Sequence, residues 1–262
     1  MKAFQGNKYV VQLIDAYDGN ENDKFDFPFV VMEYAAFGSL SHQIEKGRIS
    51  TLPGCAFKLI LQTTLAFGVQ DNMGGEPKSF RNLAHADIKP DNYLMDVNDR
   101  VEAKFKLADF GLAFEEGVDE AREGGTPNFM APEQLTHHSK PDRRSDVWST
   151  AVTALCLITG RSTDNCSPCV LVHGTMCFNQ DVYKIKLAQP LLGEPGRLLE
   201  IVRKAFNGKF SSRVEKTNDG KFYLSKGRRS SSNEEKSKMM VGILMLMLKV
   251  DATKRVTWEQ LH

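Results

Sequence analysis

Hydrophobic residues recur along the chain in short, strand-like runs and in longer, helix-like runs. Residues 8–14 and 27–34 are rich in β-branched and aromatic side chains, and the stretch between them includes the polar residues 18–23. Short runs of this composition on either side of polar turn residues are typical of β-strands. The pattern therefore predicts an antiparallel strand pair. Residues 93–95 and 105–107 predict a second pair, which would place Asp109 directly after a strand.

Three longer segments have the apolar content of buried helices. The first has apolar residues throughout 57–69, follows Pro53 and precedes a Gly-Gly pair at 74–75. Proline is favoured in the first turn of a helix, and glycine commonly ends one. The second segment spans residues 142–160, and the third is the methionine-rich stretch 239–248. We expect all of them to lie in the core, with the methionines filling gaps in the packing.

Composition places the chain among ordinary soluble proteins. The 262 residues are 41% hydrophobic and 26% charged, which predicts one large globular domain. A net charge of +1 supplies no basic field, so neither nucleic acid nor a membrane surface is an expected partner. The apolar run at 239–248 is shorter than the roughly 20 residues that a bilayer requires. We predict a cytoplasmic or nuclear protein, and the sequence leaves its oligomeric state unknown.

The cysteines form one cluster that could bind a metal. Five cysteines without an export signal predict reduced thiols. The spacing of four residues is similar to that of a zinc knuckle: Cys166, Cys169, His173 and Cys177. A variable loop with free thiols is the favoured interpretation, because proline and glycine in the same segment are typical of loops. Residues 210–238 are polar and serine-rich and predict a second exposed insert.

The residues with chemical potential are concentrated in three blocks. They read His-Ala-Asp-Ile-Lys-Pro-Asp-Asn at 85–92, Asp-Phe-Gly at 109–111 and Ala-Pro-Glu at 131–133. The blocks resemble the eukaryotic protein kinase family, whose catalytic loop reads His-Arg-Asp-Leu-Lys-Pro-Glu-Asn and whose later blocks read Asp-Phe-Gly and Ala-Pro-Glu. The resemblance covers residue 7 to the C-terminus. It implies an α+β fold in which a mainly helical large lobe follows a small β lobe.

The resemblance also implies a set of catalytic roles. Asp87 would accept the proton of the acceptor hydroxyl, and Lys89 would meet the charge on the γ-phosphate. Lysine at this position resembles the serine/threonine branch. Asn92 and Asp109 would hold Mg²⁺, which prefers hard oxygen ligands. ATP and Mg²⁺ are therefore the expected cofactors, and a protein with a Ser or Thr acceptor is the expected substrate.

Other positions are implied by the same resemblance. The adenine would lie between Leu94 and the backbone of Glu33 and Ala35, with Met32 at the back of the pocket. Thr126 would belong to the wall that binds the substrate peptide. Four residues would have structural roles, two beneath the catalytic loop and two in an ion pair: His85 and Asp146, and Glu133 with Arg255.

The chain departs from the family at two places. Ala86 replaces an arginine that usually pairs with a phosphate on the activation segment, residues 109–133. In that segment the only hydroxyl side chain is that of Thr126, and five acidic residues lie in its middle. We therefore expect activity that does not depend on phosphorylation of the segment. The second departure is that no glycine-rich phosphate loop and no strand lysine precede Lys8.

These features predict a partial kinase domain. Residues 1–35 would be the remnant of the small lobe with the hinge, and residues 36–262 the large lobe, with inserts near 162–180 and 210–238. The favoured hypothesis is an N-terminally incomplete serine/threonine kinase, because all four of the Asp87, Lys89, Asn92 and Asp109 side chains are present. As written, the chain would be a poor catalyst. The alternatives are a catalytically inactive kinase-like scaffold and a zinc-dependent interaction module.

Overall fold

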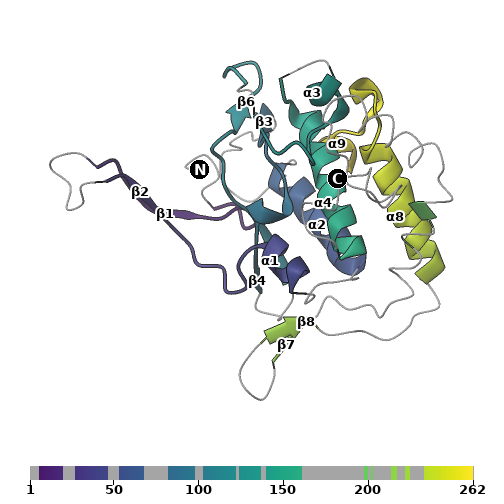
Figure 1. Ribbon diagram of the computed structural model, residues 1–262, viewed down its shortest axis with the longest axis horizontal. Coiled ribbons are helices and arrows are strands. Elements are labelled where there is room, and N and C mark those ends of the chain that lie inside the picture. Colours follow the sequence, from purple (N-terminus) through teal and green to yellow (C-terminus); the bar gives the residue numbers. More distant parts are fainter. Residues whose placement is uncertain are drawn as a thin grey trace.

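The protein is described here from a computed structural model. It covers residues 6–19, 27–46, 53–67, 82–97, 103–121, 124–136, 140–160, 198–199, 202, 214–216, 222–224 and 233–261. Within these residues the fold is α+β, with a packed body of helices and four two-stranded sheets, one of which is an arm that projects from the body (Figure 1). The zinc hypothesis for Cys166, Cys169, His173 and Cys177 falls outside the described residues.

The predicted N-terminal strand pair is present, but its first strand is displaced. β1 (Leu13–Tyr17) pairs antiparallel with β2 (Phe29–Met32). The prediction that a strand of this pair begins at residue 8 is wrong, because residues 9–11 bind elsewhere. Tyr9 and Val11 exchange backbone hydrogen bonds of 2.9 Å with Leu107. The start of the apolar run is therefore buried against a strand of the body.

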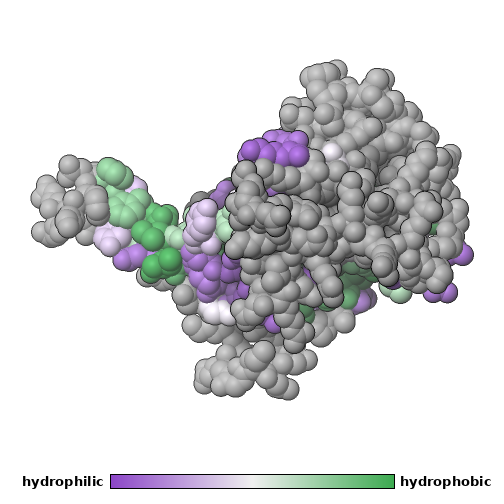
Figure 2. Space-filling model, turned by 90° about the horizontal axis from the view of Figure 1, so that it is seen from below, coloured by the Kyte–Doolittle hydropathy of each residue, from purple (hydrophilic) through white to green (hydrophobic). Residues whose placement is uncertain are grey.

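The arm carries exposed apolar side chains. Tyr17 and Phe29 stack with their ring centroids 4.4 Å apart, but Ile14, Val30 and Met32 remain exposed. Hydrophobic atoms consequently gather on the arm in the space-filling view (Figure 2). A two-stranded ribbon is marginally stable by itself, so the attachment of residues 9–11 to the body is what fixes its base.

The predicted second strand pair is confirmed. β4 (Tyr93–Val97) pairs antiparallel with β5 (Ala103–Leu107), so Asp109 follows β5 with one residue between. Beside it, β3 (Leu83–Ala84) pairs with β6 (Phe114–Glu115). This small sheet joins the chain before residue 85 to the chain after residue 111, and the two chemical blocks are thereby brought together. A separate hairpin consists of β7 (Val214–Lys216) and β8 (Phe222–Leu224).

Two of the predicted helices form the centre of the body. α2 (Pro53–Phe67) packs against α4 (Arg143–Thr159). α4 begins at a capping box made by Asp142 and Ser145, and it ends at Gly160, whose φ of 64° is the left-handed conformation that glycine adopts easily. Both helices are confirmed, although Leu61 of α2 is exposed rather than buried.

The third predicted helix is longer than expected. α8 (Asn233–Met247) begins six residues before residue 239, so the prediction that residues 210–238 form one exposed insert is wrong in this part. Ser237, Met240, Leu244 and Met247 are buried at helical spacing. The polar residues before 239 continue the same helix, because a surface helix needs apolar residues on only one side. β7 and β8 also lie in the predicted insert.

The remaining helical elements are short. They are α1 (Leu40–Glu45), α3 (Pro132–Thr136), α9 (Trp258–Leu261) and two 3-10 turns, η3 (Pro90–Asn92) and η5 (Ala252–Lys254). In the described part of the chain, no helix has the length and apolar character needed to cross a bilayer.

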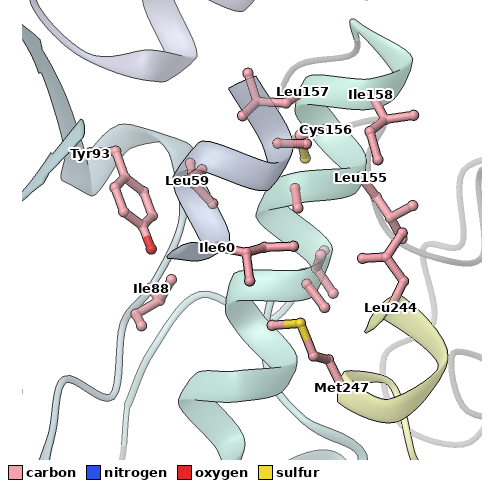
Figure 3. Packing of buried hydrophobic residues seen from close by; sticks show 14 of the residues in the cluster. Leu59, Ile60, Ile88, Tyr93, Leu155, Cys156, Leu157, Ile158, Leu244 and Met247 are labelled. Carbon is pink, nitrogen blue, oxygen red and sulfur yellow. The ribbon is translucent and has the colours of Figure 1, made fainter. Parts of the chain in front are cut away.

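The core is built around α4. Leu155, Ile158, Leu244 and Met247 pack between α4 and α8, and Ile60 of α2 lies on the opposite side (Figure 3). Phe67 of α2 stacks on Trp258 of α9 at 5.5 Å between ring centroids. α4 is therefore the element on which the other helices are assembled.

Truncation of a leucine should cost more stability at a buried position of this helical body than at an exposed one. Leu155→Ala removes a fully buried side chain and should lower the free energy of unfolding by about 2–5 kcal/mol. Leu246→Ala in α8 is the matched control, because Leu246 is half exposed, and it should cost less than about 1 kcal/mol. Urea denaturation monitored by circular dichroism measures both. Equal losses in the two variants would contradict the packing described here.

Candidate active site

The candidate site begins at the N-terminal turn of α4. Asp146 is buried there, and its carboxylate accepts the backbone N–H groups of His85 at 2.6 Å and of Ala86 at 2.9 Å. Burial raises the pKa of Asp146 to about 7, whereas the two backbone hydrogen bonds act in the opposite direction. The carboxylate thereby fixes the backbone immediately before Asp87. This arrangement agrees with the structural role beneath the catalytic loop that the family resemblance implied for Asp146.

His85 connects the same loop to the end of β5. Its Nε2 lies 2.9 Å from the carbonyl oxygen of Ala108, and its Nδ1 accepts the N–H of Asp87 at 3.3 Å. These contacts require a neutral imidazole with its proton on Nε2. Burial lowers the pKa of His85 to about 4, although the nearby charges of Asp87 and Asp109 favour the charged form. His85 is therefore a neutral residue that connects the N–H of Asp87 to the carbonyl oxygen of Ala108, the residue before Asp109.

Asp87 lies in a hydrogen-bonded group with two partners. Lys89 Nζ donates to Asp87 Oδ2 at 2.8 Å and to Thr126 Oγ1 at 2.8 Å. The Thr126 hydroxyl in turn donates to Asp87 Oδ1 at 2.8 Å. The three side chains are all partly exposed, so solvent or a ligand can reach them. Lys89 and Thr126, which are 37 positions apart in the sequence, thus both bind the carboxylate of Asp87.

Asn92 completes this group from the η3 turn. Its amide nitrogen lies 2.9 Å from the carbonyl oxygen of Asp87 and 3.2 Å from Asp87 Oδ2. Because the nitrogen is held in this way, the amide oxygen is the atom with the chemistry to bind a hard cation such as Mg²⁺. The Asn92 carbonyl also accepts the N–H of Ala108 at 2.8 Å, which places the turn beside the residue that precedes Asp109.

Asp109 is next to the group but does not share a hydrogen bond with it among the described residues. Its backbone is in the left-handed region with φ 59°, which is uncommon for a residue other than glycine. Its Oδ1 accepts the N–H of Gly111 at 3.3 Å. Asp109 follows Ala108, whose carbonyl oxygen lies 2.9 Å from His85 Nε2, and the charges of Asp87 and Asp109 both favour a higher pKa of His85. Their oxygens fit the ligand set of Mg²⁺.

The predicted adenine-binding residues lie where the arm meets the body. The backbone of residues 37–38 exchanges hydrogen bonds with Met95, and Ser39 forms a bridge to Leu94. Ala35 is buried, and its carbonyl accepts the N–H of Gly38 at 3.1 Å. Leu94 is therefore brought beside this segment. Met32, predicted at the back of the pocket, is 42% exposed on the arm.

Glu33 has side-chain contacts that sequence reasoning missed. Its Oε1 accepts the N–H of Gln12 at 2.8 Å, and its Oε2 forms an ion pair with Lys106 of β5. Lys106 is buried, so it needs a partner of opposite charge. The charged Lys106 inside the apolar predicted strand 105–107 was a signal that a buried ion pair could form, but the sequence did not indicate that Glu33 is its partner.

Another ion pair lies near the first turn of α4. Arg255 binds Glu133 in a bidentate arrangement, with N···O distances of 2.7 and 2.9 Å. Arg255 also donates to the carbonyl oxygens of Lys249 and Arg144, and its guanidinium lies 5.3 Å from the ring centroid of Trp148. The pair proposed from the sequence is present, and it ties α3 to the chain before α9.

Comparisons with known proteins agree with this arrangement. A family model described as a protein kinase domain matches residues 1–262. The chain is 34% identical over 158 residues to a probable myosin light chain kinase of Dictyostelium discoideum, covering 59% of the chain and 36% of the relative. It is 34% identical over 154 residues to a calcium/calmodulin-dependent protein kinase type 1 of Caenorhabditis elegans, covering 58% and 39%. The match therefore spans less than half of each relative.

The neutral state of His85 predicts a pH dependence of stability. Between the ordinary pKa of 6.5 and the folded value of about 4, the unfolded chain binds a proton that the folded chain does not. The contribution of His85 to the free energy of unfolding should therefore fall as pH decreases through this window, by up to about 3 kcal/mol. His85→Gln should remove this contribution, so the free energy of unfolding of the variant relative to the wild type should rise as pH decreases through this window, as measured by urea denaturation at several pH values.

The control for this measurement is His42→Gln, which removes an exposed histidine of α1 and should keep the wild-type slope. Asp146 has a raised pKa and contributes a slope of the opposite sign, but it is present in every variant, so comparison between variants removes its contribution. An unchanged slope in His85→Gln would show that His85 is not held neutral.

Proposed function

This chain belongs to the protein kinase family, and we propose that it is a serine/threonine protein kinase that transfers the γ-phosphate of ATP to a hydroxyl of a protein. The observation that carries this proposal is the hydrogen-bonded group of Asp87, Lys89 and Thr126, with Asn92 beside it. This group presents a carboxylate, an ammonium and an amide oxygen on one loop. Such a set matches the requirements of phosphoryl transfer, which needs a proton acceptor, positive charge and metal ligands.

In the proposed mechanism Asp87 orients the acceptor hydroxyl and takes its proton. Both of its carboxylate oxygens are already held, one by Thr126 and one by Lys89, so the carboxylate does not have to reorganise when the acceptor binds. Lys89 would turn its ammonium from Asp87 toward the transferred phosphoryl group, and Asn92 would still donate to Asp87 Oδ2. Asn92 and Asp109 would hold Mg²⁺, which neutralises phosphate charge when it is bound.

The nucleotide base is proposed to lie between Leu94 and the segment that starts at Glu33 and Ala35. The pairing of residues 37–39 with β4 supports this proposal, because it brings the two walls together. Residues 1–35 would then correspond to the end of the small lobe and the hinge, and residues 36–262 to the large lobe. Thr126 supports a protein acceptor, since it connects the proposed substrate wall to Asp87.

A catalytically inactive kinase-like binding module is the second candidate. The observation in its favour is that no Gly-x-Gly-x-x-Gly motif occurs anywhere in the 262 residues. Such a loop covers the phosphates of the nucleotide in the family. The two candidates differ in whether the chain binds nucleotide in a Mg²⁺-dependent manner and transfers phosphate.

Substitution of the proposed base should test catalysis directly. Asp87→Asn keeps the shape of the side chain but cannot accept the proton, so kcat should fall by roughly 10²- to 10⁴-fold. Transfer of ³²P from Mg-ATP to a degenerate Ser/Thr peptide mixture measures this, with Asp15→Asn, an exposed carboxylate of β1, as the matched control.

Asp109→Asn should remove the Mg²⁺ dependence of nucleotide binding. A wild-type chain without Mg²⁺-dependent binding and without transfer would favour the binding module.

The composition of the activation segment generates a second test. Because Ala86 replaces the phosphate-pairing arginine and Thr126 is the only hydroxyl side chain of the segment, activity should not require phosphorylation there. Treatment with a protein phosphatase should leave kcat and KM unchanged, with the removal of phosphate verified by mass spectrometry. Loss of turnover after this treatment would contradict the prediction.

A further inference from the structure

One acidic residue of the activation segment is bound to the body at two points. Glu116 follows β6, and its backbone N–H donates to the carbonyl of Asn82 at 2.7 Å. Its side chain extends toward α4, where Oε1 accepts the N–H of Arg143 at 2.6 Å. Arg143 is the first residue of α4, so the carboxylate meets a backbone donor that has no partner within the helix. Among the described residues in the middle of the segment, the side chains of Glu115, Asp119 and Glu120 have no such hydrogen bond to α4.

The end of α4 that binds Glu116 is the end that holds the catalytic loop. Asp146, three residues after Arg143, accepts the backbone N–H groups of His85 and Ala86. The charge of Glu116 is one of the smaller causes that raise the pKa of Asp146, after burial. The side chain of Arg143 is itself held by Glu259 of α9 at 2.7 Å. One helix terminus therefore fixes both the loop of Asp87 and the start of the activation segment.

The far part of the segment is closely fitted to the same loop. Gly125 has φ 108°, and a Cβ built at this position would lie 2.9 Å from the carbonyl oxygen of Ala86. The next residue, Thr126, bonds Asp87 and Lys89. A displacement of the segment by even a small distance would therefore change the contacts of the proposed base. The segment needs a fixed attachment, and Ala86 has no side chain that could bind a phosphate there.

We propose that Glu116 is a positioning residue that attaches the activation segment to the N-terminus of α4 with a permanent charge. The inference rests on the proposed kinase function, because the attachment matters through the placement of Thr126 and the substrate wall. The carboxylate belongs to the genetically encoded sequence, so this attachment needs no modification reaction. The N-terminus of an α-helix carries partial positive charge, which attracts the negative carboxylate of Glu116 and strengthens the attachment.

The test uses three variants of the full chain. Glu116→Ala removes the attachment, Glu116→Gln keeps an acceptor oxygen without the charge, and Glu120→Gln changes an exposed carboxylate of the same segment as the control. Loss of a hydrogen bond to a charged group changes an equilibrium or rate constant by roughly 10- to 100-fold. We therefore expect kcat/KM for the peptide to fall by about that factor in Glu116→Ala and by less in Glu116→Gln. Glu120→Gln should match the wild type.

Two readouts separate positioning from general destabilisation. A misplaced substrate wall should raise the KM for the peptide while the KM for Mg-ATP stays unchanged, whereas partial unfolding would change neither KM. Hydrogen–deuterium exchange without substrate should show faster exchange in residues 110–121 of Glu116→Ala. Faster exchange with an unchanged peptide KM, or exchange equal to that of Glu120→Gln, would overturn the inference.

The exchange measurement does not require activity. If the wild-type chain transfers no phosphate, the proposed function fails, and exchange in residues 110–121 still decides whether Glu116 attaches the segment. Unchanged exchange in Glu116→Ala would then refute the attachment itself. Faster exchange would retain it as a structural anchor of this segment and refute its role in positioning a substrate.

Discussion

The structure depends on one buried carboxylate at the start of the central helix. Asp146 accepts two backbone N–H groups from the loop that carries Asp87, and it does so inside the core, where an unpaired charge would be costly. The loop supplies the two partners, and without them the burial of Asp146 would oppose folding. The position of α4 and the conformation of the catalytic loop are consequently determined together. A polar interaction in the core thus specifies the geometry of the site, whereas the apolar contacts of α4 supply its stability.

Several segments use the same helix end as their reference. The loop is fixed by Asp146, the activation segment is fixed by Glu116 at Arg143, and α9 reaches Arg143 through Glu259. The ion pair of Arg255 with Glu133 ties α3 to the chain before α9, and Arg255 also donates to the carbonyl oxygen of Arg144 in the first turn of α4. Because these contacts converge on the first turn of α4, residues distant in sequence such as Asp87 and Thr126 can meet with hydrogen-bonding accuracy. The contrast is the β1–β2 arm, which projects from the body (Figure 1) and carries exposed apolar side chains (Figure 2).

The sequence predicted the elements that local rules determine. α4 was predicted with both ends correct, because Asp142 and Gly160 are strong capping signals, and β4 and β5 were indicated by short apolar runs around a turn. The three blocks named Asp87, Lys89, Asn92 and Asp109, and the first three lie in one hydrogen-bonded group with Thr126. Local patterns could not show which strand residues 9–11 join, or that polar residues 233–238 continue α8. Nor could they show the partners of Lys106 and Glu116, since those contacts join residues that are far apart in sequence and no motif marks them.

The central claim is that the side chains at 87, 89, 92 and 109 act on one Mg-nucleotide. Nuclear magnetic resonance with Mn²⁺-ATP in place of Mg²⁺-ATP tests it most directly, because the paramagnetic ion broadens the signals of nearby residues. The account predicts selective broadening of the amide signals of residues 87–92 and 108–111, with Asp15 unaffected. Broadening that is absent from both regions, or that affects only one of them, would contradict a shared nucleotide site.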